Sequence, residues 1–176
     1  MRLRIANCGL RIGVALVIVT VAIGRARAET IDRVLALVAG QLITLSDVTA
    51  ARDLGLQTSG DASDPVRAIL TKLIDRELVL AEVDRYAPPE PAADAVDGEV
   101  QRVRARFGSQ SAFDAALARS GIDEKHVRET VRQDLRMRAY LDQRFTSGDR
   151  RQALIDDWMA GLRRRGDVID LYLPDR

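Results

Sequence analysis

The sequence contains little of what most metal and nucleophilic sites need. Its 176 residues include one cysteine and one histidine. A single cysteine cannot form an intrachain disulfide, and so few cysteines and histidines disfavour a zinc site. Aromatic residues make up only 4% of the chain, which disfavours the base-stacking surfaces of nucleic-acid-binding proteins. The composition therefore argues against zinc proteins and nucleic-acid-binding proteins.

Motifs for phosphate binding and acid–base catalysis are also missing. The glycines do not form the glycine-rich patterns of nucleotide-binding loops. His126 stands beside Glu124 and Lys125 at a polar helix start, where a surface position is the simplest interpretation. The neighbouring acids Asp156 and Asp157 diverge on a helix, so they do not converge on one substrate atom. We predict no catalytic, cofactor-binding or metal-binding residue, and a protein that is not an enzyme.

The first 28 residues have the layout of a secretory signal peptide. Three arginines precede an apolar stretch, residues 12–24, and the segment Ala26-Arg27-Ala28 is a small-x-small cleavage site. The apolar stretch is shorter than the ~20 residues that span a bilayer. We therefore expect cleavage after Ala28 and export to the periplasm, with no stable membrane insertion. A retained N-terminal anchor is the alternative.

Cleavage would leave residues 29–176 as one domain of mildly acidic character. This part holds 22 of the lysines and arginines against 26 acidic residues, a net charge of −4, and it has no cysteine. Nucleic-acid affinity depends on neutralising phosphates, so an acidic domain is a poor candidate for it. A cysteine-free chain also suits an oxidising compartment.

Short strands flank the remaining chain. Residues 31–38 and 42–45 are aliphatic and are joined through Gly40, which predicts a hairpin. Ser46 is the expected N-cap of a helix over residues 48–54. Near the C-terminus, residues 168–173 have the pattern of a further strand. An isolated strand needs a partner, so we expect it to join the hairpin.

Helices fill the segment between these strands. Asp64 and Pro65 form an N-cap and first-turn pair for a helix that runs to about Tyr86. Further helices are predicted from the apolar spacing after Pro91, Ser111, Asp123 and Arg150. The predicted fold is mainly α, with a small sheet formed by the N-terminal hairpin and the C-terminal strand. Residues 29–146 would form its core, and residues 150–176 would fold back onto it.

Apolar helix faces supply the candidate binding residues. Five or more amphipathic helices can enclose a groove as well as a solid core. The candidate peptide-binding residues are Ile69, Leu73, Val100, Val103, Phe107 and Trp158. The alternative interpretation is plain core packing, with Trp158 anchoring the last helix.

The start of the predicted domain resembles that of the SurA-type periplasmic chaperones. The residues that show the resemblance are IDRVLALV at 31–38 and LITLSDV at 42–48, followed by LTKLIDRELVLAE at 70–82. The resemblance extends over nearly all of residues 29–176, including the C-terminal helix and strand. The family's parvulin isomerase domains do not fit, because only five residues separate Phe145 from Arg151.

The resemblance implies a helical domain of the kind found at the N-terminus of those chaperones. It further implies an ATP-independent holdase that binds unfolded or nascent exported proteins, including those destined for the outer membrane, through an apolar groove. Two other functions stay open. One is an adaptor or structural module that binds a single folded partner, and the other is a peptidyl-prolyl isomerase.

Overall fold

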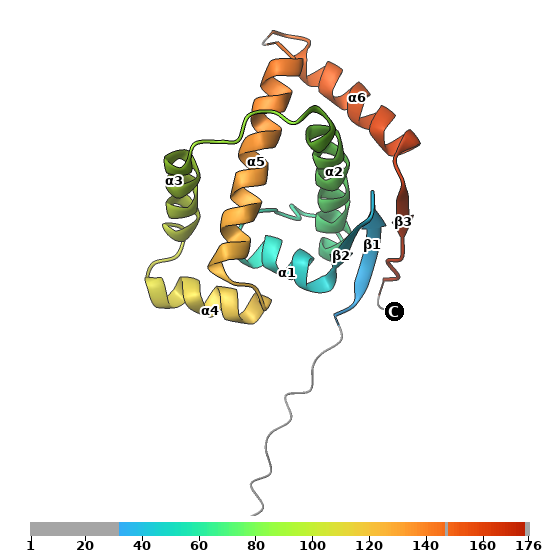
Figure 1. Cartoon of the computed structure of the whole chain (residues 1–176). Coiled ribbons are helices and arrows are strands. Elements are labelled where there is room, and N and C mark those ends of the chain that lie inside the picture. Colours follow the sequence, from blue (N-terminus) through green and yellow to red (C-terminus); the bar gives the residue numbers. More distant parts are fainter. Residues whose placement is uncertain (1–31, 147, 175–176) are drawn as a thin grey trace, which may run out of the picture. The chain divides into compact units, whose positions relative to one another are not determined.

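The computed structural model describes residues 32–146 and 148–174, so the predicted signal peptide lies outside the described residues. Within them, six α-helices and one three-stranded antiparallel sheet form a mainly helical fold (Figure 1). This confirms the predicted fold class. No helix in the described ranges combines the length and the apolar character that a membrane span requires.

The sheet begins with the predicted hairpin. Strand β1 (Val34–Val38) pairs antiparallel with β2 (Gln41–Thr44), and Ala39 and Gly40 form the turn between them. Both turn residues have positive φ values, 49° and 85°. Such a pair matches the right-handed twist of a hairpin, at a steric cost that glycine avoids and alanine does not.

The C-terminal strand joins the same sheet, as predicted. Strand β3 (Val168–Asp170) pairs antiparallel with β1, which gives the order β2-β1-β3. The backbone N–H of Leu171 continues the pairing by donating to the carbonyl of Leu35 over 2.9 Å. The regular strand is shorter than the predicted 168–173, because Tyr172 turns its N–H back to the carboxylate of Asp170.

Helix α1 (Leu45–Asp53) starts earlier than predicted, and its N-cap is Thr44 rather than Ser46. The Thr44 hydroxyl accepts from the N–H of Asp47, and the Asp47 carboxylate accepts from the N–H of Thr44 over 2.8 Å. This reciprocal pair is a capping box, which satisfies two backbone donors that would otherwise have no partner. Strand β2 therefore passes into α1 without a loop.

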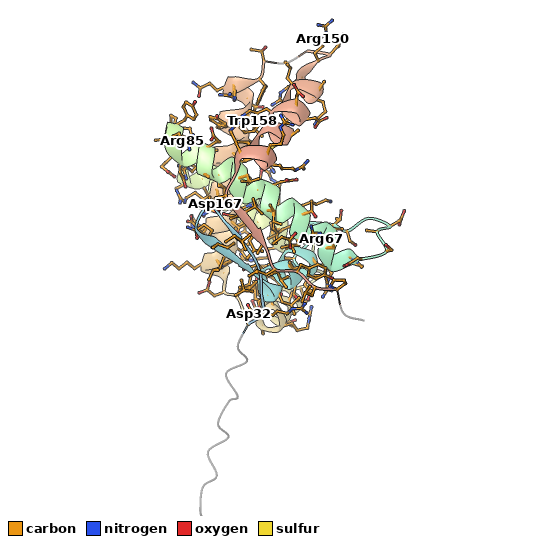
Figure 2. All side chains as sticks on the ribbon, turned by 90° about the vertical axis from the view of Figure 1, so that its right-hand side faces the viewer. Asp32, Arg67, Arg85, Arg150, Trp158 and Asp167 are labelled. Carbon is orange, nitrogen blue, oxygen red and sulfur yellow. The ribbon has the colours of Figure 1, made fainter. Side chains whose placement is uncertain are left out.

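Helix α2 (Pro65–Tyr86) has the predicted boundaries. Asp64 accepts from the N–H of Arg67 over 2.9 Å, and Pro65 occupies the first helical position. The helix ends at Tyr86, and its C-cap is Ala87, whose φ of 43° is left-handed and which immediately precedes Pro88. Arg67, labelled in Figure 2, lies near the start of α2. It joins this helix to the C-terminal segment by pairing with Asp170.

Three helices follow before the C-terminal segment. They are α3 (Ala93–Arg104), α4 (Gln110–Ser120) and α5 (Glu124–Arg144). Ser109 caps α4, not the predicted Ser111, because its hydroxyl accepts from the N–H of Ala112. Asp123 caps α5 as predicted, by accepting from the N–H of His126 over 2.8 Å.

Helix α6 (Arg151–Arg165) leads back from the end of α5 to the sheet. Arg150 lies at one end of this helix and Asp167 beyond the other, next to the hairpin (Figure 2). The N–H of Ala39 donates to the carbonyl of Asp167 over 2.9 Å, which ties the helix end to the turn. The C-terminal helix and strand thus fold back as predicted.

Apolar side chains form two separate clusters, and α5 contributes to both. The larger cluster joins the sheet, α1, α2, the end of α5 and α6, with Leu35, Leu70 and Val83 fully buried. The smaller one joins α3, α4 and the first half of α5 around Phe113 and Val127. The seam between α2 and the first half of α5 belongs to neither cluster, and polar side chains cross it.

Candidate functional site

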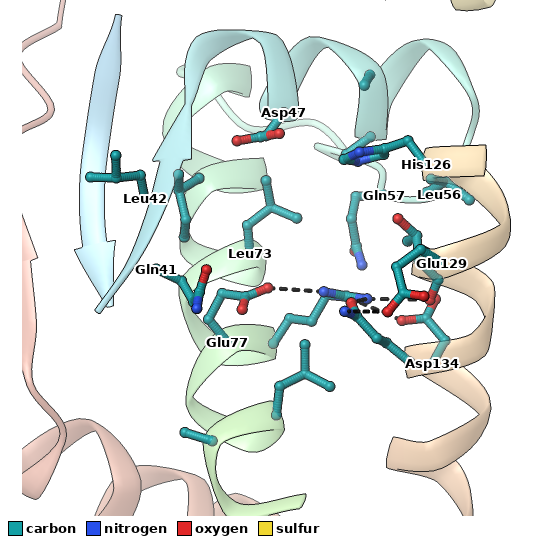
Figure 3. Close-up of a pocket in the computed structure, with 18 of the residues that line it drawn as sticks. Gln41, Leu42, Asp47, Leu56, Gln57, Leu73, Glu77, His126, Glu129 and Asp134 are labelled. Atoms are coloured by element: carbon teal, nitrogen blue, oxygen red, sulfur yellow. Dashed lines mark hydrogen bonds and ion pairs between the residues drawn. The ribbon is translucent and has the colours of Figure 1, made fainter. Parts of the chain in front are cut away.

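A cavity of about 390 Å³ lies at this seam, enclosed by the hairpin, α1, α2 and the first half of α5 (Figure 3). One wall is aliphatic. It is formed by Ile43 of β2, Ala50 and Ala51 of α1, and Leu73 and Leu80 of α2. All of these except Leu73 are buried. The apolar stripe of α2 therefore serves both as core and as cavity wall.

Arg76 crosses the seam from α2 to α5. Its guanidinium donates to the carboxylate of Asp134 over 3.0 Å and to the side-chain oxygen of Gln133 over 2.9 Å. It also donates to Glu77 over 2.9 Å and to the carbonyl of Thr130 over 3.3 Å. Only 11% of the Arg76 side chain is exposed. These bonds hold the two helices at a fixed separation without filling the space between them (Figure 3).

The cavity lining carries an excess of negative charge. Five carboxylates face two guanidinium groups, which is an excess of three formal negative charges among the acidic residues and arginines of the lining. The acids are Asp47, Glu77, Asp84, Glu129 and Asp134, and the bases are Arg76 and Arg136. A positively charged ligand therefore fits this lining better than an anion.

Burial raises the pKa of Glu77 above its ordinary value. Arg76 opposes this rise, and the charges of Asp47 and Asp84 make a smaller addition to it. Glu129 differs because it lies at the solvent side of the cavity. The hydrogen bond from Arg132 lowers the pKa of Glu129, and that pairing raises the pKa of Arg132 in turn. Burial thus has the largest effect on the pKa of Glu77, and the pairing with Arg132 has the largest effect on that of Glu129.

A second, more open groove of about 620 Å³ lies on the other side of the Arg76–Asp134 pair. It is formed by α2, α5 and α6, and its apolar surface comes mainly from Val79, Met137, Ile155 and Met159. Methionine side chains are flexible and polarisable, so a surface built from them adapts to different apolar partners. Arg76, Asp134, Leu56 and Gln57 line both spaces and form the partition between them.

The structure separates the six candidate peptide-binding residues. Ile69, Leu73 and Trp158 belong to the larger cluster, whereas Val100, Val103 and Phe107 belong to the smaller one. Ile69, Val100 and Val103 are buried, so they pack as core and form no open groove wall here. The six residues do not form one surface, and of them only Leu73 lines either space.

Trp158 packs in a group of aromatic rings where α5 meets α6. Its ring lies 6.1 Å from that of Tyr140 and 5.5 Å from that of Phe145, between centroids. The Arg144 guanidinium lies over all three rings at 5.5 to 6.0 Å. This matches the anchoring role that the sequence left open for Trp158, and it fixes the angle between α5 and α6.

The sequence analysis missed Arg76, Glu77 and Glu129. One signal for Arg76 was present, because Leu73, three positions before it, and Leu80, four positions after it, lie on the same face of the predicted amphipathic helix. His126 is exposed, as predicted, and it lines the cavity. The described residues contain no group of three or more side chains arranged to hold a metal ion.

No protein-family model matches the chain, and the search of curated proteins gave no significant match. The resemblance to SurA-type chaperones therefore depends on the quoted residues alone.

Proposed function

We propose that this protein is an ATP-independent periplasmic holdase that binds unfolded exported polypeptides, including outer-membrane proteins. One observation carries the proposal. The α2–α5 seam is bounded on both sides by spaces with aliphatic walls that the protein's own side chains leave unfilled. The quoted resemblance to SurA-type chaperones points in the same direction.

The energetics of such a surface suit binding without a nucleotide cycle. Burying ~300 Å² of client apolar surface contributes roughly 7–8 kcal/mol before costs, at ~25 cal/mol per Å². Loss of translational freedom and ordering of the client offset much of this gain. We expect net affinities in the micromolar range or weaker, which allows spontaneous release. The charged rims of both spaces keep the apolar walls compatible with a soluble surface.

The test is light scattering of a denatured outer-membrane protein diluted into buffer with and without the purified protein. We expect suppression of aggregation at equimolar ratio. Unchanged scattering over a range of ratios would overturn the proposal.

Two neighbouring positions on α6 provide a matched pair of variants. Ile155 lines the groove, whereas Leu154 is 55% exposed and lies outside both spaces. Ile155→Glu should weaken suppression and Leu154→Glu should not, with circular dichroism confirming that both fold. Equal activity of the two variants would exclude the groove as a client surface.

A structural feature also favours the adaptor alternative. One apolar row crosses the sheet, because Leu37 of β1 lies opposite Leu42 of β2 on one side and opposite Ile169 of β3 on the other. Leu42 is 60% exposed and Ile169 49%. Such a row suits a single folded partner. Capture of one folded protein, with no binding of unfolded clients, would favour this function.

Localisation and isomerase activity have separate tests. Mass spectrometry of the protein from fractionated cells should find a chain that begins at Glu29 in the periplasm. An intact N-terminus would support the anchored alternative.

A proline-peptide isomerisation assay should show no acceleration. Measurable acceleration would support the peptidyl-prolyl isomerase alternative.

A further inference from the structure

The strand β2 forms a free edge of the sheet beside the acidic cavity. It pairs only with β1 among the described strands, since the order is β2-β1-β3. Its residues Gln41, Leu42 and Ile43 line the cavity. A free strand edge next to a charged cavity combines two recognition elements for an extended polypeptide.

The register shows which backbone groups of β2 point outward. On the β3 side of β1, Ala39 donates to Asp167 and the carbonyl of Leu35 accepts from Leu171. The odd-numbered residues of β1 therefore bond β3, and the even-numbered Ala36 and Val38 bond β2. Ala36 is opposite Ile43 and Val38 is opposite Gln41, so these pairs form the β1–β2 hydrogen bonds. The N–H and C=O of Leu42, between them, point away from β1.

The lining of the cavity favours a positively charged side chain of the client. Its lining has five carboxylates against two guanidinium groups. In the close-up, Glu77 is placed on the β2 side of the cavity and Glu129 on the α5 side (Figure 3). The Arg76 guanidinium lies between them and bonds Glu77, and Arg132 pairs with Glu129. A side chain that enters the cavity therefore meets an aliphatic wall along its stem and, around its tip, a lining in which carboxylates outnumber guanidinium groups. Lysine and arginine have this construction, since a long apolar stem carries the charge.

We propose that an extended client segment adds to the free edge of β2 through the backbone of Leu42 and places a lysine or arginine in the acidic cavity. This rests on the proposed function and names the class of client segment that the seam selects. The segment carries basic residues alternating with aliphatic ones, because successive side chains of a strand point to opposite faces. Two edge hydrogen bonds and one screened charge contact keep the interaction weak and reversible.

Fluorescence anisotropy with short labelled peptides tests the proposal. The first peptide alternates valine and lysine, and the second alternates valine and glutamate at the same length. A third repeats the first with N-methyl groups on alternate amides, which blocks strand pairing and keeps every side chain. We expect the lysine peptide to bind at least about tenfold more tightly than the glutamate peptide, and we expect the methylated peptide to lose most of that affinity.

Variants locate the site. Leu42→Pro removes the outward N–H from an edge position that tolerates proline, and Leu42→Ala keeps it, so only the first should abolish binding of the lysine peptide. Glu129→Gln should weaken that binding about two- to fivefold. Asp114→Asn removes one exposed charge from α4, outside the cavity, and should leave it unchanged.

The outcomes separate this proposal from the holdase function. Equal binding of the lysine and glutamate peptides would overturn the charge preference, and equal binding of the methylated peptide would overturn strand addition. Either result with aggregation still suppressed would leave the holdase proposal intact. A protein that binds the lysine peptide as expected and suppresses no aggregation would support this site and contradict the holdase.

Discussion

The hydroxyl of Tyr172 donates to the carboxylate of Asp64, over 2.9 Å to one oxygen and 3.1 Å to the other. The same carboxylate caps α2 by accepting from the N–H of Arg67. One side chain therefore fixes the start of the longest helix and the path of the C-terminal segment.

This shared carboxylate makes the two contacts interdependent. Tyr172→Phe should lower the free energy of unfolding by about 1 kcal/mol through the lost hydrogen bond. Asp64→Ala should cost about 2 kcal/mol, because it removes the helix cap as well. Urea denaturation of both variants and of the double variant measures this. The double variant should lose less than the sum of the two, and strictly additive losses would show that the hydroxyl and the carboxylate act separately.

Arg76 should contribute more to stability than the arginines at the surface. Arg76→Met leaves Glu77 and Asp134 without their shared partner, and we expect a loss of about 2 kcal/mol. This is below the ~3–5 kcal/mol for fully buried pairs, because 33% of the Asp134 side chain is exposed. Arg52→Met breaks an exposed pair with Asp53 and should cost less than about 0.5 kcal/mol. Equal losses in thermal or urea unfolding would contradict the role given to Arg76.

The raised pKa of Glu77 predicts that the free energy of unfolding depends on pH in a specific way. Burial, with Asp47 and Asp84, raises its pKa above the ordinary 4.5, so the ionised form is disfavoured in the folded protein. The resulting cost is present at neutral pH and disappears as the pH falls below about 4.5, where the folded and unfolded states are both protonated. Glu77→Gln should therefore raise the free energy of unfolding at pH 7 by about 0.5 kcal/mol. The gain should vanish near pH 4, and a variant that is less stable at neutral pH would show that the Arg76 pairing dominates.

Substitution of glycine by alanine should destabilise the protein at Gly166 and stabilise it at Gly98. A Cβ at Gly166 would meet the side chain of Leu78 and lie 2.8 Å from the carbonyl of Leu162, so Gly166→Ala should cost about 1–3 kcal/mol. Gly98 lies inside α3 with open space around it. There, Gly98→Ala should stabilise the protein by about 0.5–1 kcal/mol. Calorimetric melting temperatures that shift in the same direction for both would contradict this packing.

The sequence predicted those features that depend on neighbouring residues. Asp64 with Pro65, and Asp123, were correct as helix starts because an N-cap acts over three residues. Thr44 was missed because Ser46 also suits an N-cap position. The deciding residue is Asp47, three positions after Thr44, which completes a capping box with Thr44. The pairing of β3 with β1 followed from a different argument, that a lone strand needs a partner.

The site could not be predicted in the same way. Amphipathic spacing identifies Ile69, Val100 and Val103 as inward-facing, but it does not say whether a partner helix or an open space lies opposite. Whether a space lies opposite depends on the separation between α2 and α5. Arg76 sets this separation through hydrogen bonds to groups that follow it by more than fifty positions in the chain. Long-range polar contacts of this kind have no local sequence pattern.

The central strand of the sheet also constrains how the protein is made. Strand β1 is the first described element and β3 is the last, so the ladder between them can form only after residues 168–170 have been synthesised. Nascent chains that stop short of Val168 would expose the β3 side of β1, a ready site for mispairing between copies. Premature termination should therefore yield aggregating fragments instead of a smaller working module.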